Sequence, residues 1–174
     1  MRWYIYILLV LFSFGCSRSN DTSKNRKIGS TNLSRVEKRI VVLEGTLKQS
    51  YQKIMTHGLD TLPIQTIHQL EANYKRAFQL GPKNERSALY LDKLQQLYLQ
   101  EKKYRLSLTW TDSLLNHFPA YNQKAILLLN AATTAELYLK DQEMMRYYYE
   151  RLLREHPKLK KEVVEMVEFR LKKS

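Results

Sequence analysis

The chain has 174 residues, a formal net charge of +12 and one cysteine. A single cysteine excludes an internal disulfide, so packing has to stabilise the fold. Glycine is sparse, with five in the whole chain, and a phosphate-cradling loop is therefore not expected. No metal-ligand spacing and no local signature of a serine or cysteine nucleophile is present. We predict a protein that is not an enzyme and uses no metal or cofactor.

The first residues have the layout of a secretory signal peptide, with one positive charge at Arg2 followed by the apolar run WYIYILLVLF. This run is too short to cross a bilayer, which requires about 20 apolar residues. It ends at Gly15 and Cys16. The stretch SFGC resembles a relaxed bacterial lipobox, in which the cysteine carries acyl chains such as palmitate and becomes the new N-terminus. The resemblance implies a signal peptide over residues 1–15 and lipidation at Cys16. The alternative is a plain signal sequence or signal anchor with an incidental cysteine.

Residues 16–33 are predicted to comprise the lipidated cysteine and a flexible linker. The stretch SRSNDTSKNRKIGST, residues 17–31, is polar and basic. It cannot bury enough apolar surface to offset the entropy lost on ordering. No aspartate of the kind used as an inner-membrane retention signal follows the cysteine. We therefore expect an exported protein, held by lipid at a bacterial membrane, with the outer membrane facing the periplasm favoured.

A helical domain is predicted over residues 34–174. The capping-box pattern from Ser34 to Glu37 indicates a helix start, and the first helix is expected to end at Gly58. Pro63 suits the first turn of a second helix, which should end near Leu80 because Gly81 and Pro82 follow. The apolar face of the first helix consists of Val36, Ile40, Leu43, Leu47, Tyr51 and Ile54.

The central segment 88–119 reads as two short amphipathic helices that fold back across a turn at residues 100–102. Neither helix can bury its apolar face alone, so the hairpin has to stack on similar hairpins. Leu94 and Leu114 are expected to be buried where its two helices meet. The apolar faces are Leu91, Leu94, Leu97 and Tyr98 on one helix, and Tyr104, Leu108, Thr111, Leu114 and Leu115 on the other.

This hairpin resembles a tetratricopeptide repeat. The positions that the family's pattern fills are held by Leu91, Leu94, Gln95, Tyr98, Ser107, Thr111 and Pro119. One spacing recurs three times along the chain, in Leu70, Tyr74, Ala77 and Pro82, in Ser107, Thr111, Leu114 and Pro119, and in Met145, Tyr149, Leu152 and Pro157. The resemblance implies an all-α array of about three helix pairs with a C-terminal capping helix. An ordinary helical bundle with proline-ended helices is the alternative.

The C-terminal part should contain three more helices. One runs from Asn122 to about Leu139, the next is capped by Asp141, and Pro157 is expected to open a last helix that reaches Ser174. Close packing is predicted for Leu128, Ala131, Ala132 and Ala135 of the first of these, and a single apolar stripe for Leu159, Val163, Val167 and Leu171 of the last.

The repeat resemblance implies a concave face lined by first-helix residues outside the packing stripe. Carried onto this sequence, that face is Asp92, Gln96, Leu99, Thr133 and Glu136. Tyr147 and Tyr148 are further candidates for a contact surface. The function expected from this face is that of a scaffold or adaptor, which binds an unidentified envelope protein or peptide while the lipid holds the membrane.

Charge distribution supplies an alternative function. The two ends of the chain are basic and the middle is not, and the C-terminal end carries Lys158, Lys160, Lys161, Lys172 and Lys173. These lysines could hold anionic lipid or polysaccharide of the envelope, and such binding should fail steeply as ionic strength rises. A nucleic-acid partner is not expected, because export removes the protein from it. The sequence leaves the oligomeric state open.

Overall fold

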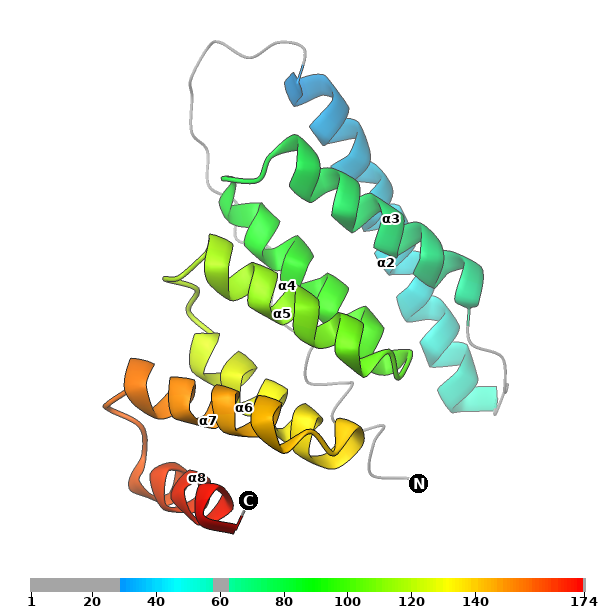
Figure 1. Cartoon of the computed structure of the whole chain (residues 1–174). Helices are drawn as coiled ribbons and strands as arrows, with labels where there is room; N and C mark the ends of the chain where they lie inside the picture. The colour runs from blue at the N-terminus through cyan, green and yellow to red at the C-terminus, as the bar shows by residue number, and fades with distance from the viewer. Residues whose placement is uncertain (1–28, 58–62, 174) are drawn as a thin grey trace.

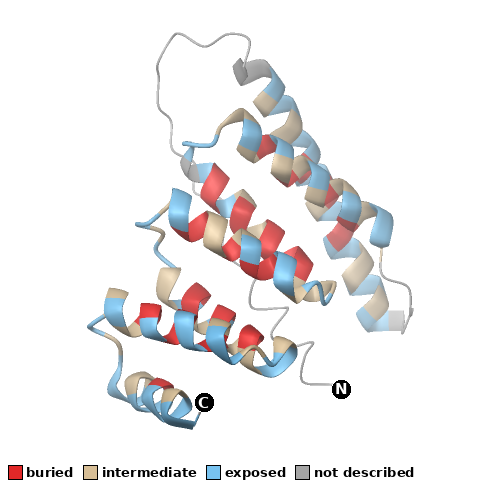
Figure 2. Ribbon diagram, viewed as in Figure 1, coloured by how far each residue is buried: buried red, intermediate tan, exposed pale blue. Residues whose placement is uncertain are grey.

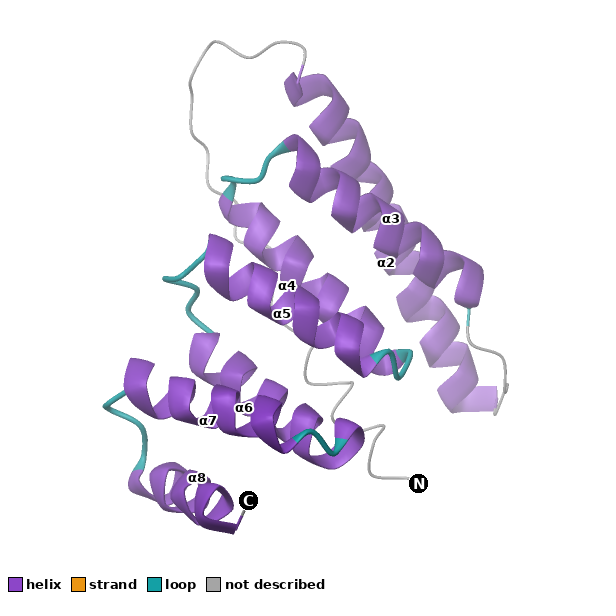
Figure 3. Cartoon of the chain, in the orientation of Figure 1, coloured by secondary structure: helices purple, strands orange, loops and turns teal. Residues whose placement is uncertain are grey.

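The computed structural model describes residues 29–57 and 63–173, and every regular element in these ranges is helical (Figures 1 and 3). The predicted all-α class is confirmed. The predicted signal peptide, Cys16 and Gly58 lie outside the described ranges. The elements are α2 (Gly29–His57), α3 (Ile64–Leu80), α4 (Glu85–Gln100), α5 (Tyr104–His117), α6 (Lys124–Thr134), a π-helical turn η1 (Ala135–Leu139), α7 (Gln142–Glu155) and α8 (Lys161–Lys173).

The helices form a stack of three antiparallel pairs. α2 packs on α3, α4 on α5, and α6 on α7, while α3–α4 and α5–α6 contacts join one pair to the next. α8 packs against α7, so that α2 and α8 lie at opposite ends of the stack (Figure 1). Because most contacts join elements that are neighbours in the chain, the molecule is built layer by layer from local hairpins.

The recurring spacing found in the sequence corresponds to a recurring buried face. The three residues that precede each proline by the same intervals are at most 3 % exposed in α3, α5 and α7. Buried residues recur along each of these helices (Figure 2). Thus the second helix of every pair buries the residues at the same three positions of the recurring spacing. They are Leu70, Tyr74 and Ala77, then Ser107, Thr111 and Leu114, then Met145, Tyr149 and Leu152.

Two apolar clusters fill the stack. The N-terminal cluster joins α2, α3 and part of α4, and includes Leu94; the C-terminal cluster extends from α4 to α8, and includes Leu114. Trp110 packs against both. Leu94 and Leu114 are each 0 % exposed, so their predicted burial is confirmed. They belong to different clusters, however, because the central hairpin packs on a neighbour at each side.

Buried polar groups lie between the two helices of the central hairpin. Ser107 Oγ donates a hydrogen bond of 2.9 Å to the carbonyl oxygen of Gln95, and Thr111 Oγ1 donates one of 3.1 Å to the carbonyl oxygen of Ser107. All three residues are buried. Small hydroxyl side chains therefore allow close approach of α4 and α5 and satisfy each other's polar atoms.

Tyrosine hydroxyls bind carboxylates throughout the stack, and most of these bonds join different helices. In each pair the ring is buried or half-buried, and its hydroxyl finds a partner in an acidic side chain. Burial, followed by the adjacent carboxylate, raises the pKa of Tyr74, Tyr121 and Tyr148. The pairs are Tyr74–Glu44, Tyr90–Glu37, Tyr98–Glu71, Tyr121–Asp92, Tyr148–Asp112 and Tyr149–Glu136.

Two predicted helix starts are wrong. α2 begins at Gly29, within the predicted linker, so Ser34 does not cap it. Leu33 packs against the N-terminal cluster, a tertiary contact ahead of the predicted start. At the other end α8 begins at Lys161 rather than at Pro157, because a turn at residues 157–158 and two further non-helical residues follow α7. Asp141 does cap α7, as predicted, with its side chain accepting from Met144 N.

In the part of the chain that the structure describes, no helix combines the length and apolarity needed to cross a membrane.

Candidate interaction site

The site begins with a change of helix type at the end of α6. Instead of continuing as an α-helix, the chain forms the π-turn η1, which ends at Lys140 in the left-handed region with φ of 54°. The amide of Asp141 donates to the carbonyl oxygen of Ala135 at 3.1 Å and closes this turn. π-turns are rare and frequently occur at functional sites. Here Ala135 stays buried while Glu136 reaches α8.

Glu136 connects the last pair to α8. Its Oε1 accepts a hydrogen bond of 2.5 Å from Arg170 Nη1, and its Oε2 accepts one of 3.4 Å from the hydroxyl of Tyr149. A charge-assisted bond of this kind is stronger than a bond between neutral groups. Glu136 therefore fixes the position of Arg170 on α8, the helix with the fewest partners.

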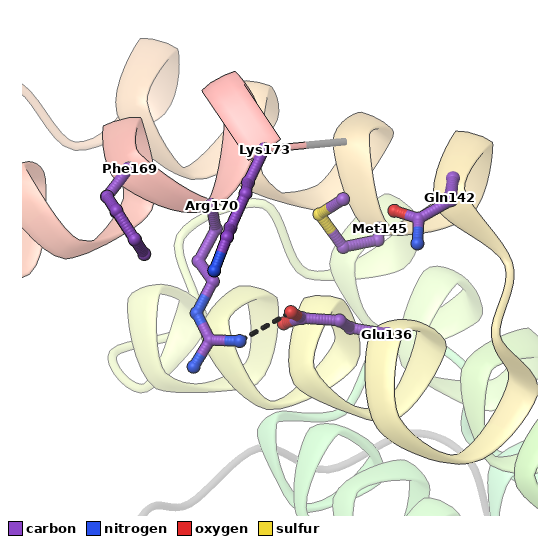
Figure 4. Close-up of a pocket in the computed structure, with 6 residues that line it drawn as sticks. All are labelled: Glu136, Gln142, Met145, Phe169, Arg170 and Lys173. Carbon is purple, nitrogen blue, oxygen red and sulfur yellow. Dashed lines mark hydrogen bonds and ion pairs between the residues drawn. The ribbon is translucent and has the colours of Figure 1, made fainter.

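A hollow of about 250 Å³ opens beside this ion pair, between η1, α7 and α8 (Figure 4). Pockets for small-molecule ligands usually measure about 300–1,000 Å³. The hollow is smaller than that range, so its size suits one or two side chains of a protein partner better than a complete small molecule. Its lining residues are Glu136, Gln142, Met145, Phe169, Arg170 and Lys173.

The hollow combines an apolar floor with a polar rim. Met145 is 1 % exposed and forms part of the floor, whereas Phe169 on α8 is 59 % exposed. The Nζ of Lys173 lies 5.3 Å from the centroid of the Phe169 ring. Lys173 forms no ion pair with any residue that the structure describes. An aromatic side chain and a cation without an ion pair are thus available to a partner at one place, above a buried methionine.

One of the five predicted groove residues lines this hollow, namely Glu136. Asp92 is buried and accepts hydrogen bonds of 3.0 Å from Gln95 Nε2 and from the Tyr121 hydroxyl, so it is not available to a partner. This correction follows from the tyrosine–carboxylate pairing described above. Thr133 donates to the carbonyl oxygen of Leu129 at 2.9 Å, and Gln96 and Leu99 are half-buried on α4.

The tyrosines predicted as a contact surface behave differently from each other. Tyr148 is 1 % exposed, and its hydroxyl donates to Asp112 Oδ2 at 2.9 Å, so the prediction is wrong for this residue. Tyr147 is 49 % exposed and accepts from Arg151 Nη1 at 3.2 Å. Helical spacing places Tyr148 beside the buried stripe of α7, and its polar end is satisfied across the pair interface.

The predicted basic residues at the C-terminus are all exposed: Lys158, Lys160, Lys161, Lys172 and Lys173. Lys161 pairs with Glu165 at 3.5 Å on the same helix. Lys173 lines the hollow, which brings one predicted basic residue next to Glu136 of the predicted groove (Figure 4). The predicted groove and the predicted basic surface, which were predicted from the sequence as separate sites, therefore each contribute a residue to this hollow.

Four lining residues were not predicted: Gln142, Met145, Phe169 and Arg170. Phe169 could have been predicted from the sequence as an exposed contact residue. It is a large apolar residue that lies outside the stripe of Leu159, Val163, Val167 and Leu171. The other three could not be found in the same way. Their place depends on the angle between α7 and α8 and on the π-turn, neither of which leaves a pattern in the sequence.

A partly buried ion network joins the start of α6 to the end of α7. Arg151 Nε donates to Glu155 Oε1 at 2.7 Å, and Lys124 Nζ lies 2.5 Å from Glu155 Oε2. Burial alone would raise the pKa of Glu155, yet the hydrogen bonds from Lys124 and Arg151 outweigh it, and the pKa lies below its ordinary value. For Asp112 burial prevails over the bond from Tyr148 and the charge of Arg151, and its pKa is raised.

Glu155→Gln is expected to destabilise the protein at neutral pH by about 1.5 kcal/mol, because two charge-assisted hydrogen bonds lose their anion. The folded-state pKa of Glu155 is depressed, so its contribution is complete above the unfolded value of about 4.5 and is lost as pH falls through the folded pKa. Urea titrations at pH 7 and pH 3 should therefore show a larger difference from the parent protein at pH 7 than at pH 3. Glu162→Gln on the exposed side of α8 is the control. An equal loss at both pH values would contradict this role of the charge.

In the described ranges no group of three or more His, Cys, Asp or Glu side chains could hold a metal ion. Comparison with protein-family models, curated proteins and solved structures gave no match. Function is therefore inferred from the residues and the geometry of the chain itself.

Proposed function

We propose that the protein is a lipid-anchored scaffold of the bacterial envelope, in which a short tetratricopeptide-like array presents the hollow beside α8 to a partner protein or peptide. The observation that carries the proposal is the combination of exposed Phe169, unpaired Lys173 and buried Met145 at one end of the stack. Exposed aromatic residues that border a small hollow are typical anchors of protein interfaces.

The likeness to tetratricopeptide repeats is supported by the pairing of successive helices and by the shared burial of the recurring positions. A stack of this kind suits a scaffold because each layer is fixed by its neighbours. A rigid surface loses little conformational entropy when it binds, which leaves more of the contact energy as affinity. α8 serves as the capping helix, with Val167 turned inward and its lysines outward.

Membrane attachment is supported by the sequence. An apolar run of signal length ends at Gly15 and the chain's one cysteine. A single acyl chain gives marginal membrane binding, whereas two chains anchor a protein stably. Diacylation at Cys16 would supply both. The proposed location is a bacterial membrane, with the outer membrane facing the periplasm preferred.

The proposal is tested by capturing partners from envelope membranes with full-length protein. Phe169→Ala should reduce recovery of a native partner strongly, with an affinity loss of roughly thirtyfold if the ring acts as an interface anchor. The melting temperature should change little, because surface substitutions usually alter stability by no more than about 0.5 kcal/mol.

Ile64→Ala is the matched control. Ile64 is 57 % exposed on the first pair, away from the hollow, so this variant should capture the partner as the parent protein does. A charge-reversal variant, Lys158→Glu with Lys160→Glu, tests the alternative function. If charge reversal abolishes capture and Phe169→Ala has no effect, the basic surface is the site and the hollow is not.

A further inference from the structure

The charged residues of α2 are sorted by sign between its two faces. Its two carboxylates, Glu37 and Glu44, are turned toward the rest of the stack. Glu37 accepts from the hydroxyl of Tyr90 at 2.9 Å and from Arg86 at 3.3 Å. Glu44 accepts from the hydroxyl of Tyr74 at 2.7 Å and from Lys93 Nζ at 2.6 Å. Both carboxylates of this helix are therefore paired with residues of α3 and α4.

Four of the five cations of α2 lie on its other side, and Lys48, one turn after Glu44, lies on the flank between the two faces. Each is exposed, and none forms an ion pair within the described residues; they are Arg35, Lys38, Arg39, Lys48 and Lys53. Together they make a surface with five positive charges and no negative one, which we call the outer face of α2. An ordinary solvated helix mixes both signs on its exposed side.

The outer face also exposes apolar side chains between the charges. Val41 and Val42 are 68 % and 67 % exposed, and Met55 is 51 % exposed. Gly45 lies between the valines and Lys48, and a Cβ atom added there would meet nothing within 4 Å. No described part of the chain covers this side of the first pair, which is the end of the stack opposite α8 (Figure 1).

We infer that the outer face of α2 lies on a bilayer that contains anionic phospholipid. Each lysine or arginine near such a surface contributes about 1 kcal/mol, so five unpaired cations suffice to hold a small domain there. The valines can enter the headgroup region beside them. A second copy of the chain does not fit this face, because two surfaces of five positive charges repel each other.

The inference rests on the proposed membrane anchor, which brings α2 to the surface, since Gly29 follows Cys16 by 13 residues (29 minus 16). It adds an orientation to the proposed scaffold. With α2 on the bilayer, α8 and its hollow lie at the end of the stack that points away from the membrane (Figure 1). The partner would then approach from the aqueous side.

The test measures the reactivity of individual lysines in the full-length protein reconstituted into vesicles. One set contains phosphatidylglycerol with phosphatidylethanolamine, and the other contains phosphatidylcholine alone. A membrane-impermeant acetylating reagent and mass spectrometry report each lysine separately. Lys38, Lys48 and Lys53 should react several-fold more slowly on the anionic vesicles, and high salt should remove the difference because it screens exposed charges. Lys158, Lys160 and Lys172 at the other end should react equally on both.

Arg35→Glu with Arg39→Glu should abolish the protection of the remaining lysines without changing the melting temperature, and Lys158→Glu with Lys160→Glu is the matched control. Equal reactivity on both vesicles, with the protein still floating with them, overturns the lipid contact and leaves the anchor intact. Failure to float with either vesicle overturns both. Protection that appears in native envelopes but not on phosphatidylglycerol vesicles means that an acidic protein covers the face, and this also overturns the inference.

Discussion

Replacing Leu114 with alanine should lower the free energy of unfolding by about 2 to 5 kcal/mol. The side chain is 0 % exposed within the C-terminal cluster, which joins α4 to α8. Three carbon atoms, one methine and two methyl groups, would be removed from a position that neighbouring layers hold from both sides, so the cavity cannot close completely. Denaturation with urea or heat measures the loss. A marginally stable domain of this size could unfold entirely near the upper end of this range.

Leu94→Ala should cost a similar amount, because Leu94 is also fully buried but belongs to the N-terminal cluster. Since the two leucines lie in separate clusters, the losses should add to within about 0.5 kcal/mol in the double variant. Leu106→Ala is the control, as Leu106 is 46 % exposed on α5. If both core variants melt with the parent protein, the buried faces of α4 and α5 have been assigned wrongly.

Cys16→Ser should remove the protein from the membrane fraction or leave it uncleaved. The expectation follows from the apolar run that precedes Gly15, which is too short to remain as a membrane span. Without acyl chains no other anchor of comparable strength is expected, since the contact of α2 with lipid depends on charge and is weakened by salt. Fractionation of cells in high-salt buffer measures the effect. Ser17→Ala is the neighbouring control. Unchanged membrane association together with normal cleavage at this junction would remove the lipoprotein proposal.

Helical periodicity predicted most of the fold. The stripes on α4 and α6 are buried as expected, and so is that on α5 except for Tyr104, which is half-buried. α3 ends where Gly81 and Pro82 interrupt it. These features are local, because a helix end needs a residue that cannot continue it and a buried face needs a period of 3.6. The starts of α2 and α8 were missed, since both depend on contacts with other helices.

The polar interior could not be predicted in the same way. Periodicity treats Tyr74 and Tyr148 as apolar or surface residues, and it treats Glu44, Asp92 and Asp112 as solvated. In the structure the hydroxyls of these two tyrosines bind Glu44 and Asp112, and Tyr121 binds Asp92. Which tyrosine meets which carboxylate depends on the packing of separate helices. The candidate site was therefore predicted only in part, through Glu136 and Lys173.

The two proposed surfaces have different physical requirements. The hollow needs the geometry of η1, α7 and α8, and its apolar part should resist salt. The outer face of α2 needs only exposed charge and should be salt-sensitive. A variant of one surface should leave the other intact, because they lie at opposite ends of the stack (Figure 1).

The scaffold proposal is tested most directly by photo-crosslinking in living cells. A photoreactive amino acid would replace Phe169 on the rim of the hollow, or Ile64 at a similarly exposed position on the first pair. Position 169 should give a discrete crosslinked protein that mass spectrometry can identify, and position 64 should not give it. The yield at position 169 should persist in high salt. Crosslinking of one protein from position 64, with none from position 169, would contradict the account.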